Sequence, residues 1–531
     1  MTAKAFGRWR QGAAGGSSSL APSRRGKPWA GLWVMLLVLP LALLAGLVAG
    51  TGSKTLFVLV LGMVLAPWVL LMPSTWLLAL LLAMATVGAG CLQYFGRISQ
   101  AHWIPTLLLA VMMLRIPFDA LRARSGGDEP VRIGGLSAVL MAFVLVFLAS
   151  AAINLVAPMQ FLVGLRHYVF PLALAVAVVQ ARADPRFWAG VLRGIPWLMV
   201  LQVPLCAYQY LFVGRARSEQ AFGAVGISWD AVVGSFGGNP EGGGASGALA
   251  LFLSFGVAAT LVLRRSGLIG RALAAASLLA CALCALMAEI KVLVVFLPLA
   301  LLLVNRQRIF SSPVSLLGWV LSTALLTVVL LQAYNFIHYA KRSGGQNATV
   351  AESLSTSIKA ERDPRFFNPL TGEVSRGGAL LLWSDYNLGS ALSPYSLVGW
   401  GPAASKISTL FGVGSAAKGK RFTLTTSTGS QMLWDLGLLG LGLFFAVGGF
   451  TVRQGLQQAR RWAALPAAGG APPVQWAVAE VAALGAWLCM AGVFYNGDAI
   501  NNPAVQVLLA LCVGWVLWLH RQPSAAPARS A

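Results

Sequence analysis

Runs of about 20 apolar residues recur along almost the whole chain, separated by short polar stretches. This is the length at which a helix crosses the hydrocarbon core of a bilayer. The pattern predicts membrane-spanning helices at roughly 29–50, 55–72, 74–95, 103–118, 133–157, 161–181, 187–213, 246–264, 268–288, 289–304, 314–334, 431–452, 474–494 and 503–520. The runs at 103–118 and 289–304 are short enough to be re-entrant. We therefore expect an all-α polytopic membrane protein with about 12–14 transmembrane helices.

The composition supports this interpretation. Hydrophobic residues make up 57% of the 531 residues and charged residues only 10%, whereas soluble proteins carry about 25% charged residues. The net charge of +23 does not indicate nucleic-acid binding, because the basic residues gather in alternate loops, such as those that hold Arg24, Arg264 and Arg460. We expect a multi-pass protein of the bacterial inner membrane, and the positive-inside bias predicts that its N-terminus is cytoplasmic.

The same pattern divides the chain into five segments. We expect a basic, disordered cytoplasmic tail at 1–28, a transmembrane bundle at 29–334, a large extracytoplasmic loop at 335–430, C-terminal transmembrane helices at 431–521 and a disordered tail at 522–531. The first apolar run is longer than a typical signal-peptide core, so it is expected to remain as an anchor.

Neither the cysteines nor the histidines show the spacing of a metal site, and we expect no metal and no cofactor. The six cysteines all lie inside apolar runs, where they are expected to pack as small apolar residues. The segment GSAAKGKR at 414–421 nearly spells a phosphate-binding loop, but Arg421 stands where a Ser or Thr would bind magnesium. Lys418, Lys420 and Arg421 could still hold another phosphate by charge, or form a solvated basic loop.

Three of the charged residues inside apolar runs are functional candidates. Arg166 belongs to QFLVGLRHYVFPLALAV, and Glu289 and Lys291 belong to ALMAEIKVLVVFLPL. A charge within a membrane segment is costly and is therefore a functional candidate, although a long side chain near a helix end can also reach the headgroups. The predicted topology places all three near the outer ends of their helices, where two cations would suit the anionic headgroup of a lipid.

The glycine-rich segment GSFGGNPEGGGASG at 234–247 predicts a soft loop at the same outer face. Such a loop could close over a substrate and bring Asn239, Glu241 and the backbone to it, or it could be a flexible hairpin. If Arg166 and Lys291 hold a diphosphate leaving group, a carboxylate could take the proton of an acceptor hydroxyl. The candidates for this catalytic base are Glu241 and Glu289, with Asp230 and Asp385 nearby in the outer loops.

The order of these features resembles the bacterial O-antigen ligase and polysaccharide polymerase superfamily over roughly residues 155–450. The motifs that carry the resemblance are GLRHYVFP (164–171), PLCAYQYLF (204–212), GSFGGNP (234–240), EIK (289–291), GWGPAASKIS (399–408) and TLTTSTGSQMLWDLGLLGLGLFF (423–445). The resemblance implies transfer of a glycan from an undecaprenyl-diphosphate carrier at the periplasmic face to a glycan or lipid acceptor, without metal or nucleotide. It implies a role in O-antigen, capsule or exopolysaccharide synthesis, with Arg166 and Lys291 matching basic residues around the diphosphate.

The chain departs from that family in one respect. Ligases and many polymerases of this type carry a His near the end of the large loop, where this chain has TLTTSTGSQ and the loop's only histidine is His338. The departure favours a polymerase-like or divergent member in which a carboxylate or substrate positioning replaces the histidine. Two other functions stay open: a transporter or flippase of lipid-linked glycans, and a non-catalytic subunit of a polysaccharide assembly complex. A transporter would more naturally show inverted repeats and paired broken helices, and the sequence shows no such symmetry.

Overall fold

The computed structural model describes residues 68–123, 134–181, 183–214, 231–238, 245–288, 290–334, 374–389, 393–408, 410–420, 424–464 and 473–522, with a few isolated positions between them. The chain divides into two units, Met1–Leu71 and Met72–Ala531. Only scattered helical residues of the first unit are described. The second unit contains the candidate site.

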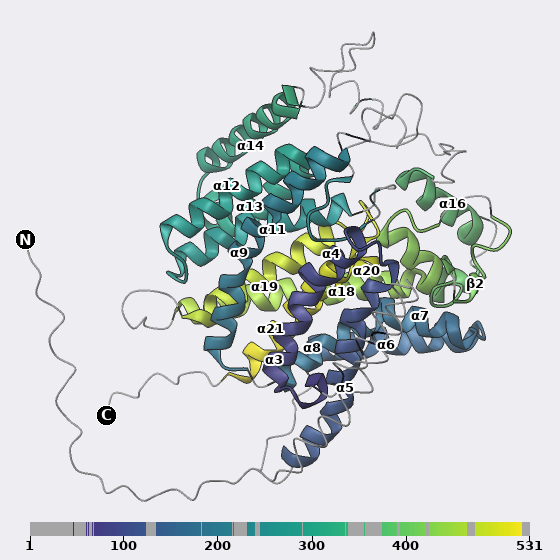
Figure 1. The fold of residues 1–531 in the computed structure, drawn as a ribbon. Coiled ribbons are helices and arrows are strands. Elements are labelled where there is room, and N and C mark those ends of the chain that lie inside the picture. Colours follow the sequence, from purple (N-terminus) through teal and green to yellow (C-terminus); the bar gives the residue numbers. More distant parts are fainter. Residues whose placement is uncertain are drawn as a thin grey trace, which may run out of the picture. The chain divides into compact units, whose positions relative to one another are not determined.

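The described part of the second unit consists mostly of helices (Figure 1). Its first half contains α3 (Ser74–Ala83), η1 (Met84–Gly88), α4 (Ala89–Tyr94), η2 (Ser99–Trp103), α5 (Ile104–Ala123), α6 (Gly135–Ile153), α7 (Pro158–Tyr168), α8 (Phe170–Gln180), α9 (Pro185–Tyr208) and η4 (Gln209–Gly214). Its second half contains α11 (Ser246–Arg265), α12 (Arg271–Ala288), α13 (Leu293–Ile309), α14 (Pro313–Tyr334), α16 (Arg376–Leu388), α17 (Pro394–Val398), α18 (Thr428–Ala463), α19 (Val474–Ala491), α20 (Asp498–Asn501) and α21 (Pro503–Arg521). Between α17 and α18, β1 (Ile407–Ser408) and β2 (Gly412–Val413) pair as an antiparallel hairpin.

Many of these helices are apolar enough for a bilayer. Nine helices within the described ranges are long and apolar enough to cross a membrane, or ten if α7 and α8 form one bent span. The predicted all-α class and its apolar helices are therefore confirmed, while the count of 12–14 spans and the orientation stay predictions. Of the two runs expected to be short, 103–118 belongs to the 20-residue α5, and 289–304 gives the 17-residue α13.

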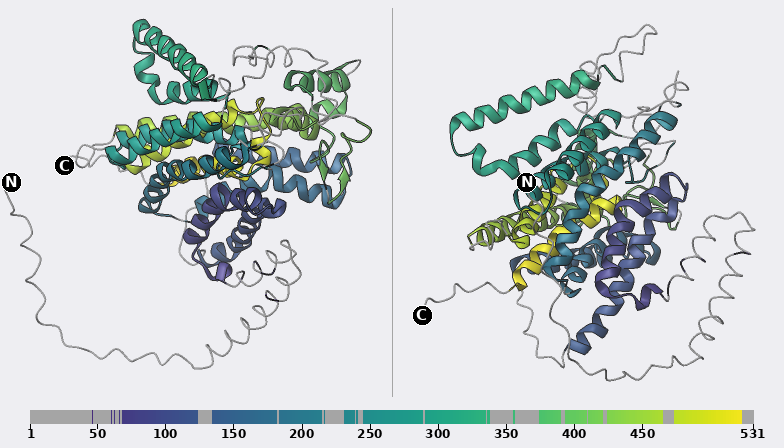
Figure 2. Two further views of the ribbon diagram at one scale, coloured as in Figure 1. Left: turned by 45° about the horizontal axis from the view of Figure 1, so that its top comes forward. Right: turned by 60° about the vertical axis from the view of Figure 1, so that its left-hand side comes forward.

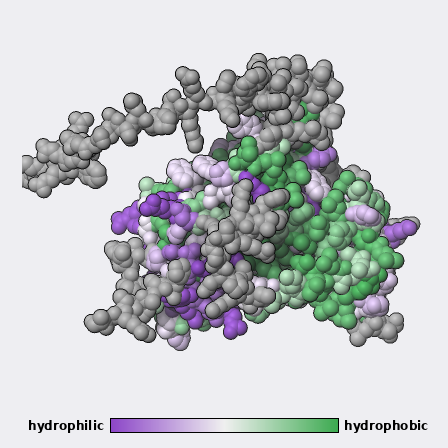
Figure 3. Space-filling view, turned by 90° about the horizontal axis from the view of Figure 1, so that it is seen from below, coloured by the Kyte–Doolittle hydropathy of each residue, from purple (hydrophilic) through white to green (hydrophobic). Residues whose placement is uncertain are grey.

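The core of the second unit lies around α11, α19 and α21, which are buried along most of their length. Helix α19 packs against α18, and α21 packs against α8. Other helices expose apolar side chains, as expected for contact with lipid. Helix α14 contacts α12 and α13 at one edge of the helices (Figures 1 and 2). Most of its apolar side chains are exposed. Figure 3 shows that hydrophobic residues form a broad surface on one face of the molecule.

Two of the apolar helices are broken, and the breaks position the candidate site. The run predicted as one helix at 161–181 bends by 51° between α7 and α8. Pro171 causes this break because it has no N–H for the carbonyl of His167 and its ring crowds that carbonyl. The His167 carbonyl instead lies 3.4 Å from the Gln506 side-chain amide of α21.

The second break lies in α18, where Gly437 has φ 66° and ψ −165°. A side chain at Gly437 would come within 2.4 Å of the Leu397 carbonyl, and one at Gly399 within 2.4 Å of the Asp435 carbonyl. Both positions therefore need glycine, since only glycine allows this φ and this close approach of two backbones. The pair joins the end of α17 to the start of α18 and fixes the turn that leads toward Lys406.

Candidate functional site

The polar side chains of the second unit concentrate where α7 ends. Arg166, His167 and Tyr168 occupy the last turn of α7, and all three are buried, Arg166 with 5% of its surface exposed. The loop after α17, the first turns of α18 and the short helix α20 pack around them. We call Arg166, His167, Tyr168, Lys406, Gln431, Asp435 and Asn501 the polar cluster.

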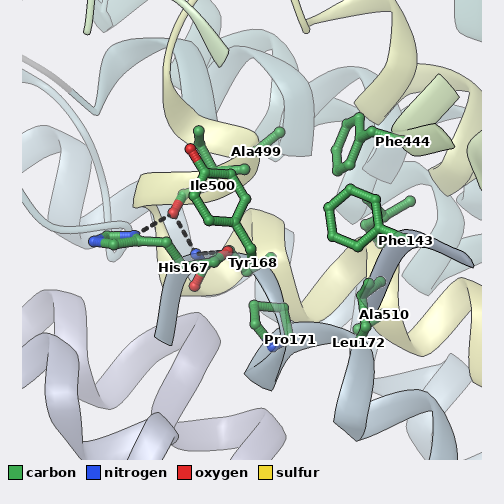
Figure 4. A pocket seen from close by; sticks show the side chains of 11 residues that line it. Phe143, His167, Tyr168, Pro171, Leu172, Phe444, Ala499, Ile500 and Ala510 are labelled. Carbon is green, nitrogen blue, oxygen red and sulfur yellow. Dashed lines mark hydrogen bonds between the residues drawn. The ribbon is translucent and has the colours of Figure 1, made fainter. Parts of the chain in front are cut away.

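His167 links the two cations of the polar cluster. Its Nδ1 lies 2.6 Å from the carbonyl oxygen of Ile500 (Figure 4). A carbonyl can only accept, so Nδ1 carries the proton and Nε2 is left as an acceptor. Nε2 lies 2.9 Å from Lys406 Nζ and 3.4 Å from Arg166 Nη1. His167 is therefore a neutral bridge between two donors, and neither of its nitrogens is available as a base.

Lys406 also donates to the side-chain oxygen of Asn501. Asn501 donates in turn to Gln431 Oε1 at 3.0 Å, and Gln431 Nε2 lies 3.4 Å from the Tyr168 hydroxyl. Burial lowers the pKa of Lys406 from its ordinary value of 10.5 to about 7; the nearby Asp435 opposes this shift and Arg166 adds to it. The ammonium is thus held in a polar but dry setting where its charge is costly.

Asp435 is the carboxylate of the polar cluster, and its oxygens already have partners. It has no exposed surface. Oδ2 accepts from the Tyr168 hydroxyl at 2.7 Å and from the Ala403 N–H at 3.1 Å, and Oδ1 accepts from the Ser405 N–H at 2.7 Å. Asp435 therefore fastens the loop that carries Lys406 to both α7 and α18, which identifies it as a positioning residue.

Arg166 has no carboxylate partner within the described ranges. Its guanidinium carbon lies 4.7 Å from the centroid of the Trp103 ring, and its Nε is buried without a hydrogen-bond partner among the described residues. Neighbouring His102 adds no positive charge at neutral pH, because burial and then the nearby Arg166 lower its pKa to about 4. With two basic side chains and one carboxylate that is already engaged, the polar cluster holds an excess of positive charge and is suited to an anion.

Apolar surface adjoins this charge. Arg166 lines a shallow groove whose other walls come from α3, α5, α8 and α21. These walls are mostly apolar and include Leu81, Leu109, Phe170 and Val507. A second, mostly apolar pocket lies behind His167 and Tyr168, with Phe143, Leu172 and Phe444 in its lining (Figure 4). A ligand at Arg166 therefore meets a cationic centre and an apolar surface together.

The described half of the glycine-rich segment is buried and firmly held, which corrects the expectation of a soft loop for residues 234–238. Gln209 Oε1 accepts from the N–H groups of Val233 and Gly234 at 2.9 and 2.7 Å. Gln202 Oε1 accepts from the Ser235 N–H at 2.8 Å. Amide side chains from α9 and η4 replace the contacts that glycine cannot make, so this half is part of the packed unit.

Helix α20 connects that glycine-rich segment to the polar cluster. The Asn502 side chain donates to the Phe236 carbonyl at 3.0 Å, while the adjacent Asn501 contacts Lys406 and the Ile500 carbonyl receives His167. Asp498 of α20 is buried, and burial raises its pKa to about 7. Helix α20 and Asn502 therefore join the glycine-rich segment to the residues that contact His167 and Lys406.

The structure places five of the ten predicted site residues. Arg166 lies in the polar cluster. Lys291 lies half-buried in the turn between α12 and α13. Asp385 and Lys418 are exposed, on α16 and after β2, and Lys420 lies among aromatic rings. The other five lie outside the described residues: Asp230, Asn239, Glu241, Glu289 and Arg421.

Sequence reasoning missed Lys406, Asp435 and Asn501. Asp435 meets the same criterion as Arg166, since it is a single charge in the apolar stretch MLWDLGLLGL. Asn501 belongs to NGDAINNP, a dense polar stretch between the last two apolar runs. Lys406 carries no such local signal, because it follows a Gly/Ala-rich stretch that is typical of a solvated turn.

Comparison of the chain with protein-family models and with curated proteins finds no match. The likeness to the O-antigen ligase and polymerase superfamily therefore remains a resemblance of motifs. Any function must be argued from the polar cluster and the groove beside it.

Proposed function

We propose that this protein transfers or polymerises a glycan from a lipid-diphosphate carrier at the outer face of the bacterial inner membrane, in the synthesis of a surface polysaccharide. One observation carries the proposal: Arg166 and Lys406 lie on either side of neutral His167, and the cluster's carboxylate is spent on Tyr168 and two backbone N–H groups. A diphosphate would supply the negative charge that this site lacks.

The proposed reaction needs the positive charge of Arg166 and Lys406 when the bond to the leaving group breaks. An acceptor hydroxyl oxygen attacks the anomeric carbon of the glycan, the bond from this carbon to the phosphate oxygen breaks, and the lipid diphosphate leaves with the electron pair. Arg166 and Lys406 stabilise the negative charge that develops on the leaving oxygen. The hydroxyl proton goes to a base, for which Glu241 and Glu289 remain our candidates.

The groove beside Arg166 supports a lipid-linked donor rather than a soluble one. Its walls are mostly apolar, and Arg166 contributes its charged group. A carrier lipid has the same two properties, an isoprenoid chain joined to a diphosphate. Burial of the chain would contribute roughly 25 cal/mol for each Å² of apolar surface removed from water.

A second function is favoured by the two broken helices. Transporters often bind their substrates where discontinuous helices meet, and here the end of α7 meets the first turns of α18 through the bond between Tyr168 and Asp435. The second candidate is therefore movement of a lipid-linked glycan across the membrane by the same anion site.

Purified protein in nanodiscs, supplied with a lipid-diphosphate oligosaccharide and an acceptor, tests both functions. Chain growth is expected for the wild type, with loss of product in Arg166→Ala and Lys406→Met. Arg166→Lys should recover only part of the activity, because a two-pronged planar donor becomes a point charge. Lys418→Gln removes an exposed lysine from the same region and is the matched control.

Proteoliposomes separate the remaining outcomes. Movement of the lipid-linked glycan without chain growth would refute the transferase function and support the transporter function. Neither growth nor movement, with intact protein, would refute both and leave a non-catalytic subunit. Equal amounts of each variant in the membrane, with unchanged elution on gel filtration, show that lost activity is not lost folding.

A further inference from the structure

Four aromatic rings converge around α17 and the first turns of α18. Tyr386 comes from α16, Tyr395 from α17, Trp400 from the turn after it, and Trp434 from the first turns of α18. Tyr395 and Trp400 stack with centroids 4.1 Å apart, and Tyr386 meets Trp434 edge-on at 5.9 Å. We call these four rings, together with Lys420, the aromatic site.

Lys420 lies among three of these rings. Its Nζ is 4.2 Å from the centroid of Trp434, 4.5 Å from Tyr386 and 5.7 Å from Trp400, and it donates to the Ala416 carbonyl at 2.7 Å. Among the described residues it has no carboxylate partner. Cation–π contacts hold the ammonium at a fixed place, where it can still attract an anion.

The aromatic site adjoins the polar cluster. The backbone N–H of Trp400 donates to the backbone carbonyl of Trp434 at 2.9 Å, and Trp434 directly precedes Asp435. Six residues after Trp400, the same loop reaches Lys406. The loop that carries Trp400 therefore also carries Lys406, and the first turns of α18 carry both Trp434 and Asp435.

Both parts of the aromatic site match one kind of ligand. The C–H face of a sugar ring packs on aromatic rings, and the Tyr386 ring is open, with 56% of the residue exposed. A carboxylate on the sugar would pair with the Lys420 ammonium. An aromatic belt at the membrane interface would also collect Trp and Tyr, but it would not require rings from three separate segments to surround one lysine.

We propose that Tyr386, Tyr395, Trp400 and Lys420 form a binding subsite for a sugar residue that carries a carboxylate. The proposal rests on the proposed function and deepens it, because it makes the glycan on the lipid carrier an acidic one. The diphosphate and the glycan then occupy adjacent parts of one continuous site.

Binding to the purified full-length protein in nanodiscs, without any lipid diphosphate, tests the subsite. The probes are a short oligogalacturonate and a neutral maltooligosaccharide of the same length, followed by calorimetry. The wild type should prefer the acidic probe. Lys420→Gln should weaken that binding by about fivefold or more and remove the preference, whereas Lys420→Arg keeps it. Tyr386→Ala should weaken both probes, while Tyr386→Phe, which keeps the ring, binds like the wild type.

Matched controls exclude general effects. Arg453→Gln removes an exposed basic residue from the far half of α18, and Trp197→Ala removes an aromatic residue that is 62% exposed on α9. Both should leave binding unchanged. Equal binding of the two probes, or no binding of either, overturns the subsite, as does a Tyr386→Ala defect seen only in binding to lipid vesicles.

The experiments distinguish a failure of the subsite from a failure of the proposed function. Oligogalacturonate binding should persist in Arg166→Ala, because the sugar does not need the diphosphate site. Acidic-sugar binding without any glycan transfer would uphold the subsite and refute the transferase. Transfer of a strictly neutral glycan, with Lys420→Gln fully active, would uphold the transferase and refute the subsite.

Discussion

Binding of the carrier should weaken as the pH rises, because Lys406 must be charged to hold a diphosphate. Burial lowers the pKa of Lys406 to about 7 in the empty protein. A bound diphosphate raises this pKa, since an anion nearby favours the ammonium. The complex then binds more protons than the free protein above neutral pH, so association takes up a proton and loses strength at higher pH.

The size of the effect follows from the fraction of Lys406 that is charged before binding. With a pKa of about 7, that fraction is about 90% at pH 6 and about 1% at pH 9, so the affinity should fall by roughly 90-fold across this range. This figure holds if the ammonium in the complex stays protonated throughout. The carrier contributes nothing to the slope, because each phosphorus of a glycosyl lipid diphosphate has only a strongly acidic hydroxyl.

The assay is a titration of a lipid-diphosphate sugar into the protein in nanodiscs at several pH values. Lys406→Arg is the decisive variant, because a guanidinium stays charged over the whole range. It should bind with nearly constant affinity, and Lys406→Met should bind weakly and equally at every pH. A wild-type slope that persists in Lys406→Arg would refute the reasoning.

Other groups near Lys406 need their own controls. His167 bridges to it from α7 and Asp435 faces it from α18, and both are fully hydrogen-bonded. Burial and Arg166 keep the pKa of His102 near 4, below the range of the titration. Among the described residues, Asp498 in α20 is the competitor that titrates inside that range, since burial raises its pKa to about 7. Asp498→Asn should leave the slope intact.

Four further predictions concern topology and chemistry. Cysteines introduced at Ser355 and Ser415 should react with an impermeant thiol reagent in intact spheroplasts, and labelling only after lysis would reverse the orientation. Activity should survive EDTA, since within the described ranges no three His, Cys, Asp or Glu side chains gather as a metal site; loss that magnesium or manganese restores would contradict this. Asp435→Asn should cost about 3 kcal/mol of stability, because its amide nitrogen would meet a backbone N–H donor, of Ser405 or of Ala403, whichever way the amide is turned, and an unchanged unfolding temperature would show that the carboxylate is dispensable. Glu241→Gln should reduce turnover by roughly 100-fold, and normal Glu241→Gln activity beside a dead Glu289→Gln would move the base to Glu289.

The apolar pattern predicted the helical class because the length and hydrophobicity of each helix can be read from its own residues. Arg166 was found for the same reason, as a charge within an apolar run. Lys406 was not, because its partner His167 lies 239 positions away and nothing in the local sequence marks the pair. The glycine-rich segment misled for a related reason: its composition predicts softness, and the Gln202 and Gln209 side chains that hold it come from a different helix.

The unmatched positive charge around Arg166 also bears on what happens after the reaction. In the proposed reaction the spent carrier is left as a lipid diphosphate with a free terminal phosphate, which carries more negative charge than the donor did. Two cations that hold the donor therefore hold the by-product more tightly. We expect the escape of the empty carrier, rather than bond cleavage, to set the pace of the cycle. A downstream phosphatase that consumes the free carrier would then prevent its rebinding and so relieve its inhibition of the protein.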